Sequence, residues 1–275
     1  MANVPKGVVF CIFVFSGWAM ATHAEELTKG FVESFSSVSL TDWHVAEYDF
    51  GHPHFDTDWR KAQAVFGDTL ASSTQNGLLL KLSPAVELSA THNRFIGGSI
   101  RRLIPTGFGR YESWIQPSLN PGTIAGFFTY SGPAYGTQHD EIDIEFLGKN
   151  MNQLHIAWFV NGALTNKFID LGFNTSEKPH HYAFDWLPEK IRWYVDGRSV
   201  FETSKADGPL PAPPGLLFAN IWAADPSIQK WAGLANPKSS GEAYFNQISF
   251  TPLTKMRDEV TTIGTMESER HLFLE

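Results

Sequence analysis

The chain has 275 residues, of which 43% are hydrophobic and 18% charged, a composition typical of a soluble globular protein. Its formal net charge is −8 and its basic residues are not clustered, so it lacks the Lys and Arg patches that neutralise phosphates. Nucleic acid is therefore not an expected partner. Aromatic residues make up 14% of the chain and include nine tryptophans, whose flat rings suit stacking against sugars.

The first 24 residues predict a signal peptide. Lys6 supplies a positive charge, and residues 7–18 form an apolar core well short of the roughly 20 residues that span a membrane. Cleavage after Ala24 or Ala21 would suit a signal peptidase; the alternative is a single membrane anchor. The one cysteine, Cys11, lies in this segment, so the mature protein would have no disulfide. We therefore expect a secreted protein, extracellular or periplasmic, without membrane contact after cleavage.

From residue 31 to 252, short alternating or apolar runs are separated by turn residues, the pattern of an all-β protein. Asp196-Gly197, followed by the run 198–202, predicts a tight hairpin. No longer stretch has helical periodicity, which argues against a βαβ fold. The runs expected to form strands are 77–82, 110–115, 125–130, 141–146, 153–159, 181–186, 191–195, 216–222 and 243–250. We predict a jelly-roll β-sandwich of two antiparallel sheets with a concave substrate cleft.

Two further segments have no expected chemistry. Residues 206–215 include four prolines and are expected to form a rigid connector rather than a domain linker. Residues 253–275 are polar and mixed in charge, and we expect a C-terminal tail, either loose or a short helix.

The most informative segment is DEIDIEF, residues 140–146. On a strand, Glu141, Asp143 and Glu145 share one face, and the two isoleucines and the phenylalanine between them share the other. The apolar residues predict a core face. A row of three acids on the opposite face costs stability because like charges raise one another's pKa. The row is therefore more typical of a functional site than of an ordinary solvated face.

Two neighbouring carboxyl groups are what glycoside hydrolysis requires. A separation of about 5–5.5 Å gives retention of configuration, and a wider one gives inversion. The Cα atoms of Glu141 and Glu145 are expected to lie about 13 Å apart, so their side chains must lean together to reach the retaining distance. A calcium site is an alternative, because three acids supply oxygen ligands, although a flat strand lacks the loop carbonyls that wrap the ion. A purely structural row is the other alternative.

The segment FFTYSGPAYGTQHDEIDIEFLG, residues 127–148, resembles the active-site segment of glycoside hydrolase family 16, in its lichenase-like branch of endo-1,3-1,4-β-glucanases. IDLGFNTS (169–176), HYAFDW (181–186) and WYVDG (193–197) are further matches in the same order. The resemblance implies a catalytic domain over residues 25–252 that acts as a retaining endo-β-glycanase.

The resemblance also implies roles for single residues. Glu141 matches the nucleophile, Glu145 the acid/base, and Asp143 the aspartate that holds the nucleophile and modulates its charge. No metal ligand is expected at the catalytic centre. The positions that match sugar contacts of the family are Arg101, Phe128, Tyr130, Asn220, Trp222 and Trp231. For each aromatic residue among them, a core position is the alternative.

The chain departs from the lichenase pattern at three positions. His139 replaces a tryptophan, Ser99 replaces a glutamate, and Ala157 replaces an asparagine opposite the catalytic strand, with His155 two residues earlier. The lichenase disulfide is also missing. These changes predict a roomier, differently polar site, in which His139 and His155 contact the substrate. The pattern is also similar to rhizobial-type endo-β-glycanases that cut bacterial exopolysaccharide such as succinoglycan.

The resemblance implies that catalysis requires no cofactor. A structural calcium ion is implied near Ser34, Gly77 and Asn246, where an asparagine stands instead of an acid. The expected partner is a polysaccharide, bound by a monomer. Two other functions stay open: a transglycosylase of the same family, and a non-catalytic carbohydrate-binding protein, since fold does not fix function. The intact acid row argues against the second.

Overall fold

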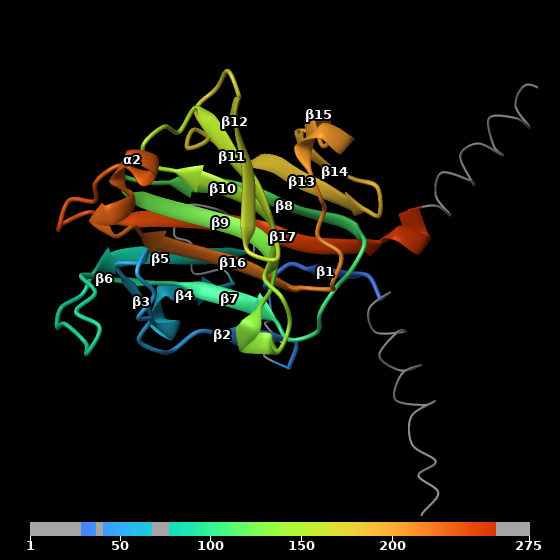
Figure 1. Ribbon diagram of the computed structural model, residues 1–275. Helices are drawn as coiled ribbons and strands as arrows, with labels where there is room; N and C mark the ends of the chain where they lie inside the picture. Colours follow the sequence, from blue (N-terminus) through green and yellow to red (C-terminus); the bar gives the residue numbers. More distant parts are fainter. Residues whose placement is uncertain (1–28, 37–40, 68–76, 257–275) are drawn as a thin grey trace, which may run out of the picture.

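A computed structural model of the chain describes residues 29–36, 41–67 and 77–256. Two β-sheets stack face to face (Figure 1). The predicted signal peptide with Cys11 lies outside the described residues, as does the tail after residue 256. Within the described part, no helix is both long and apolar enough to cross a membrane.

One sheet has seven strands. In spatial order they are β12 (Ala163–Asp170), β11 (Gln153–Val160), β10 (Asp140–Leu147), β9 (Thr123–Ser131), β16 (Leu216–Ala223), β7 (Ser99–Arg102) and β2 (Trp43–Val45). All of its pairings are antiparallel. Strand β10, which carries the acid row, lies between β11 and β9 in the interior of this sheet.

The other sheet has ten strands. Its main path runs through β15 (Arg198–Glu202), β14 (Lys190–Val195), β13 (His180–Leu187), β8 (Gly109–Ser118), β17 (Gly241–Pro252), β5 (Leu78–Pro84), β6 (Phe95–Gly97) and β3 (Thr57–Trp59). Strand β1 (Phe31–Glu33) pairs with β17, and β4 (Ala64–Phe66) pairs with β5. Strands β3 and β6 run parallel, the one exception among the described pairings. The predicted sandwich is confirmed.

Among the residues that the structure describes, helical structure is confined to short turns, in line with the absence of helical periodicity in the sequence. One α-helical turn in the described part is α2 (Gln229–Ala232), after the 3₁₀ turn η4 (Pro226–Ile228). Three more 3₁₀ turns in the described part are η1 (Lys61–Gln63), η2 (Pro133–Tyr135) and η3 (Lys205–Asp207). Residues 253–256 are also helical.

The core lies between the sheets and is built by alternation along the strands. Ile142 and Ile144 of β10 are fully buried, and Phe146 is 1% exposed, so the predicted core face is confirmed. Burying such a side chain contributes about 1.5–3 kcal/mol. Because these three residues fix one face of β10 inward, the acids between them must face outward.

The proline-rich connector 206–215 closes one edge of the sandwich. The indole N–H of Trp158 donates to the carbonyl of Pro209 at 3.3 Å, and that of Trp186 donates to Pro211 at 2.9 Å. Prolines restrict the connector's backbone, so the two carbonyls are held ready for the buried indoles. The connector thereby accepts the indole hydrogen bonds of two core tryptophans, one from each sheet.

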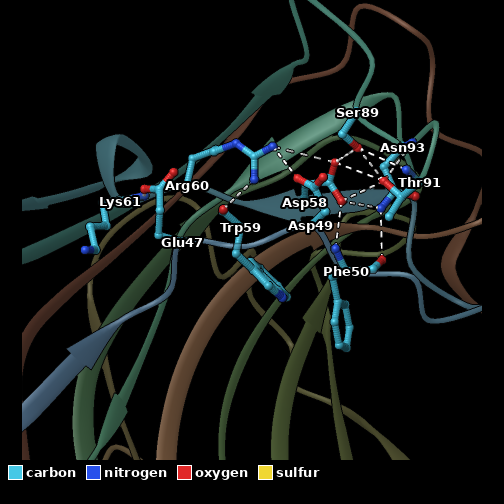
Figure 2. A network of polar contacts seen from close by, with 10 residues as sticks. All are labelled: Glu47, Asp49, Phe50, Asp58, Trp59, Arg60, Lys61, Ser89, Thr91 and Asn93. Carbon is cyan, nitrogen blue, oxygen red and sulfur yellow. Dashed lines mark hydrogen bonds and ion pairs between the residues drawn. The ribbon is translucent and has the colours of Figure 1, made fainter.

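A polar network holds the segment that precedes β3 (Figure 2). Asp58 is 2% exposed and accepts hydrogen bonds from the backbone N–H of Phe50 and the side chains of Ser89, Thr91 and Asn93. Burial alone would raise the pKa of Asp58, but these donors bring it below its ordinary value. The ionised carboxylate therefore ties together loops that are far apart in the sequence.

The same segment joins the two sheets next to the acid-bearing face. Phe55 forms a β-bridge with Ala224, directly after β16. Thr57 Oγ1 both donates to the carbonyl and accepts from the N–H of Ala223. These contacts lay the Phe55 ring against Trp222, with ring centroids 4.0 Å apart.

Candidate active site

Strand β10 presents Glu141, Asp143 and Glu145 on the outer face of the seven-stranded sheet. The two glutamate side chains are each 17% exposed, and Asp143 is 4% exposed. The three acids are therefore reachable from solvent at the glutamates and enclosed at the aspartate. They share one face, as the sequence predicted.

The register of the neighbouring strands determines what surrounds each acid. Strand β9 places Tyr130, Phe128 and Gly126 opposite Glu141, Asp143 and Glu145, and β11 places Phe159, Ala157 and His155 opposite the same three acids. Aromatic rings therefore flank the nucleophile candidate on both sides. Beside the middle acid, one neighbour is only a methyl group.

Each glutamate has a histidine partner. His139 Nε2 lies 2.7 Å from Glu141 Oε2, and His155 Nδ1 lies 2.8 Å from Glu145 Oε2. The His139 ring also stacks on Phe159, with centroids 4.6 Å apart. Both histidines were expected to contact substrate, and each of them lies directly against a carboxylate. No ion pair is formed by Asp143 with any described residue.

Their surroundings shift the pKa values of Asp143 and Glu141 to different extents. Burial raises the pKa of Asp143 well above its ordinary value, and the charges of Glu141 and Glu145 raise it further. Burial also raises the pKa of Glu141, but hydrogen bonds from His139 and Asp143 act in the opposite direction. The net pKa of Glu141 is raised, whereas that of Asp143 is raised well above its ordinary value, so a proton shared between the two resides preferentially on Asp143.

Buried anchors fix the backbone of β10. The indole N–H of Trp193, on β14 of the other sheet, donates to the carbonyl of Asp143 at 3.0 Å. Asp140, 3% exposed, accepts hydrogen bonds from Gln138 Nε2 and the backbone N–H groups of Asn161 and Ala212. This anchor was not predicted from the sequence. A charged residue at a core-facing position of the strand was the available signal, because such a group needs internal partners.

An aromatic row borders the site beyond Glu145. Trp231 lies 5.4 Å from His155 and 6.0 Å from Trp222, measured between ring centroids. Trp222 is only 6% exposed because Phe55 covers it. The half-buried Trp231 therefore presents the more accessible ring of the two tryptophans that sequence analysis singled out. Phe168 of β12, which sequence analysis did not single out, is 48% exposed and packs on His155.

On the other side of the acids, β16 and β7 complete the outer face. Phe128 stacks on Phe218, with centroids 5.1 Å apart, and the guanidinium of Arg101 lies over the ring of Tyr135 at 5.5 Å. Phe218 was also missed, although it lies two residues before Asn220 and so shares its face.

Asn220 marks a place where a ligand group fits. Its side chain is 6% exposed, and its Oδ1 has no hydrogen-bond partner among the described residues. Gly126 lies between Asn220 and Glu145 in the register, and a Cβ there would come within 2.9 Å of that oxygen. Glycine thus leaves an open notch beside the acid. Ser99 pairs with Asn220 from β7 and is also buried.

Metal-binding side chains are not grouped in this region. Across the described residues, no set of three or more His, Cys, Asp or Glu side chains is arranged to hold a metal ion. The acid row is instead bordered by rings and hydrogen-bonding groups.

A jelly-roll sandwich with a close row of carboxyl groups on an aromatic-lined outer face is the arrangement of a glycoside hydrolase. Residues 51–239 match the model of glycosyl hydrolases family 16. The chain belongs to this family, and the prediction of a glycosidase is confirmed.

Named relatives cover most of the chain. The beta-glucanase of Bacillus subtilis (strain 168) is 32% identical over 232 residues, covering 84% of this chain and 90% of the relative. The beta-glucanase of Paenibacillus polymyxa is 36% identical over 222 residues, covering 80% and 87%. These similarities support the lichenase-like branch that the sequence motifs indicated.

Solved structures of beta-glucanases are similar to the chain over most of its length. A prokaryotic beta-1,3-1,4-glucanase (lichenase) from a mouse hindgut metagenome has a TM-score of 0.75 at 30% identity, covering 82% of this chain and all of that one. The Bacillus licheniformis beta-glucanase has a TM-score of 0.71 at 32% identity, covering 81% and 97%. A Crh5 transglycosylase shares the fold at a TM-score of 0.62 and 18% identity, which shows the fold alone.

Proposed function

We propose that this protein is a secreted endo-β-glycanase that hydrolyses a β-1,3/1,4-linked glucan or a succinoglycan-like exopolysaccharide with retention of configuration. The observation that carries the proposal is the placement of Glu141 and Glu145 on one outer face, each against its own histidine. The similarity to beta-glucanases over most of the chain supports the polymer class.

In this proposal each acid has its own role. Glu141, ionised and held by His139 and Asp143, attacks the anomeric carbon, while Glu145 gives its proton to the leaving glycosidic oxygen. Glu145, now a base, then takes a proton from water, which attacks the glycosyl ester on Glu141 and releases a sugar with its original configuration. Asp143 stays protonated and keeps the nucleophile in place by its hydrogen bond.

The departures from the lichenase pattern favour a decorated bacterial polysaccharide. His139 lies on Glu141 and presents an imidazole where lichenases have a larger indole, and Ala157 lies beside Asp143 with a single methyl group. We therefore expect more room beside the nucleophile than in lichenases, which suits a substituted sugar.

A panel of lichenan, laminarin and succinoglycan, with mass analysis of products, tests this assignment. We expect higher kcat/KM on succinoglycan than on lichenan, and His139→Trp should move the ratio toward lichenan. If lichenan is cleaved and succinoglycan is not, the protein is a lichenase. The departures at His139, Ser99 and Ala157 then do not alter its substrate. Products longer than the substrate would indicate a transglycosylase, and binding without products a carbohydrate-binding protein.

The cellular setting belongs to the same proposal. A signal peptide at residues 1–24 would release a monomeric catalytic domain, residues 25–252, followed by the tail. Mass analysis of the N-terminus of protein exported by the native host checks this, and an uncleaved chain would favour a membrane anchor.

A structural calcium ion would be held by oxygens around the irregularity of β17 between Phe245 and Ile248. Asn246 lies in that irregularity, Ser34 directly follows β1, and Gly77 directly precedes β5; both strands flank β17. Backbone and amide oxygens are suitable calcium ligands, and the absence of a carboxylate among the three predicts weak binding. The melting temperature should rise with added calcium and fall with chelator, more strongly in Asn246→Asp.

A further inference from the structure

The exposure of the tryptophans singles out a second place on the molecule. Of the nine tryptophans, Trp18 lies outside the described residues and six others are at most 6% exposed. Trp231 is half-buried at the candidate active site. Trp114 is 45% exposed, and it lies on β8 of the ten-stranded sheet, on the face opposite the acids.

Trp114 has no packing role that requires an indole. Tyr111, Ser113 and Ile115 of β8 point into the core, so Trp114 stands on the outer face of the sheet. Its one described ring contact is with His181 on β13, at 5.4 Å between centroids. A threonine or lysine would suit an exposed strand position at least as well, so folding does not explain this side chain.

The Trp114 ring borders a hollow of about 520 Å³ that also has polar residues in its walls. Lys178, His181 and Asp196 line it, with Pro179 and His180. Burial would raise the pKa of Asp196, but hydrogen bonds from His180 and from the backbone of His181 lower it, so its carboxylate is ionised. That side chain is 45% exposed and has free lone pairs for a further hydroxyl group.

The composition of the hollow matches a sugar better than a protein or an anion. One flat ring beside a cation and a carboxylate offers stacking together with both hydrogen-bond donors and acceptors. The opposite charges of Lys178 and Asp196 do not form the cationic cluster that a phosphate needs. No other exposed large apolar side chain in the described residues lines the hollow, so the contiguous patch typical of a protein interface is missing.

The polar surface continues along β8, which favours a chain of sugars over a single one. Gln116 and Ser118 follow Trp114 on the same face, and Ser118 lines a second hollow of about 430 Å³ with Lys81 and Glu242. Trp114 and Ser118 lie four strand residues apart, about 13 Å.

We propose that Trp114 and its hollow form an accessory binding site for a β-glycan chain, on the opposite side of the sandwich from the catalytic acids. The identity of the polymer rests on the proposed function, but the site is separate from the chemistry. It would hold the enzyme on a long polysaccharide without taking part in bond cleavage.

Native affinity electrophoresis through gels containing lichenan or succinoglycan tests the proposal. The full chain with Glu141→Gln, which prevents hydrolysis, serves as the parent for Trp114→Ala, Trp114→Phe and Val32→Ala. Val32 is a matched control, because it is 69% exposed on β1 of the same sheet and lies outside both hollows. We expect Trp114→Ala to raise the apparent Kd at least about fivefold, Trp114→Phe less, and Val32→Ala not at all.

In the active background, Trp114→Ala should keep kcat/KM on a short aryl β-glycoside of the same linkage. If the wild type cleaves the polymer but Trp114→Ala is retarded like its parent, the accessory site is wrong and the proposed function stands. If the wild type cleaves no polymer and is retarded by none, both are wrong. A wild-type dimer that becomes monomeric in Trp114→Ala would assign the ring to a second copy of the chain and overturn the proposal.

Discussion

The outer faces of the two sheets both carry acidic side chains, but these acids have different neighbours. On the ten-stranded sheet, Glu112 lies 3.3 Å from His181 and 3.8 Å from Arg110, and Arg110 also contacts Asp185 at 3.1 Å. The hydrogen bond from His181, aided by the charge of Arg110, holds the pKa of Glu112 below its ordinary value. On β10, Asp143 lies between two glutamates and its pKa is raised.

The difference separates a structural row of charges from a catalytic one. Paired acids on an exposed sheet face contribute modestly to stability and have no reason to change protonation near neutral pH. Three carboxyl groups on one strand, with histidines as their only described basic partners, cost stability and create groups that can exchange protons. The comparison predicts that equivalent substitutions on the two faces have different consequences.

The largest contrast is expected for Glu141→Gln against Glu112→Gln. Removing the nucleophile should lower kcat/KM on the polymer by about four orders of magnitude or more, the scale of losing one essential catalytic group. Glu112→Gln, on the other face, should stay within about twofold of the wild type. Initial rates of reducing-end release measure both, and comparable losses would remove the distinction between the faces.

Glu145→Ala tests which of the two glutamates is the acid/base and which is the nucleophile. Azide needs no general base, so it should restore turnover of Glu145→Ala on a substrate with a good leaving group and yield a β-glycosyl azide. Product analysis decides the roles: an α-azide from Glu141→Ala, with Glu145→Ala still inactive, would mean that they are reversed.

A smaller contrast is expected between two histidine–carboxylate pairs. His155→Ala removes the group 2.8 Å from Glu145 and should lower kcat about 10–100-fold, the value of one hydrogen bond to a charged group. His181→Ala removes the partner of Glu112 and should leave kcat on a short aryl β-glycoside unchanged. Steady-state kinetics of the two variants, with melting curves as controls for folding, test this. Equal effects would make the His155 contact merely structural.

The smallest contrast concerns stability as a function of pH. The pKa of Asp143 is raised in the folded protein. Its protonated side chain therefore contributes stability that is fully present below the unfolded-state pKa of about 3.9 and is lost as the pH rises through the folded-state pKa. Asp143→Asn does not titrate, so its melting temperature should improve relative to the wild type as pH rises from about 4 to 8. The pKa of Glu112 is lowered in the folded protein, so its carboxylate stabilises the fold above the unfolded-state pKa of about 4.3. The melting temperature of Glu112→Gln should therefore fall relative to the wild type over the same pH range. Parallel curves would contradict the cited pKa directions.

All of the longer buried strands could be predicted from the sequence, because either alternation or a continuous apolar run marks them. Strand β10 was expected at 141–146 and extends over Asp140–Leu147, and the Asp196-Gly197 hairpin between β14 and β15 is present with positive φ at both residues. Strand β12 was missed because most of its side chains on both faces are exposed, which leaves no alternation to detect. The parallel pairing of β3 with β6 joins two three-residue strands, too short for any periodic signal.

The candidate site was predictable where it depended on a single strand. The shared face of Glu141, Asp143 and Glu145 follows from the period of two. The pairing of His155 with Glu145 depends on the register between β10 and β11, which cannot be predicted from the sequence of the loop between them. The burial of Trp222 depends on Phe55, whose segment is held by hydrogen bonds that Asp58 accepts from Ser89, Thr91 and Asn93, far away in the sequence.

The stereochemistry of the first turnover tests the central claim most directly. If Glu141 attacks the anomeric carbon and Glu145 acts first as acid and then as base, the product must keep the β configuration. Proton NMR of the early reaction, on the polysaccharide that the substrate panel identifies, should show the β-anomer signal before mutarotation generates the α-anomer. An α-anomer that appears first would contradict the double displacement and place a water molecule, not Glu141, at the anomeric carbon.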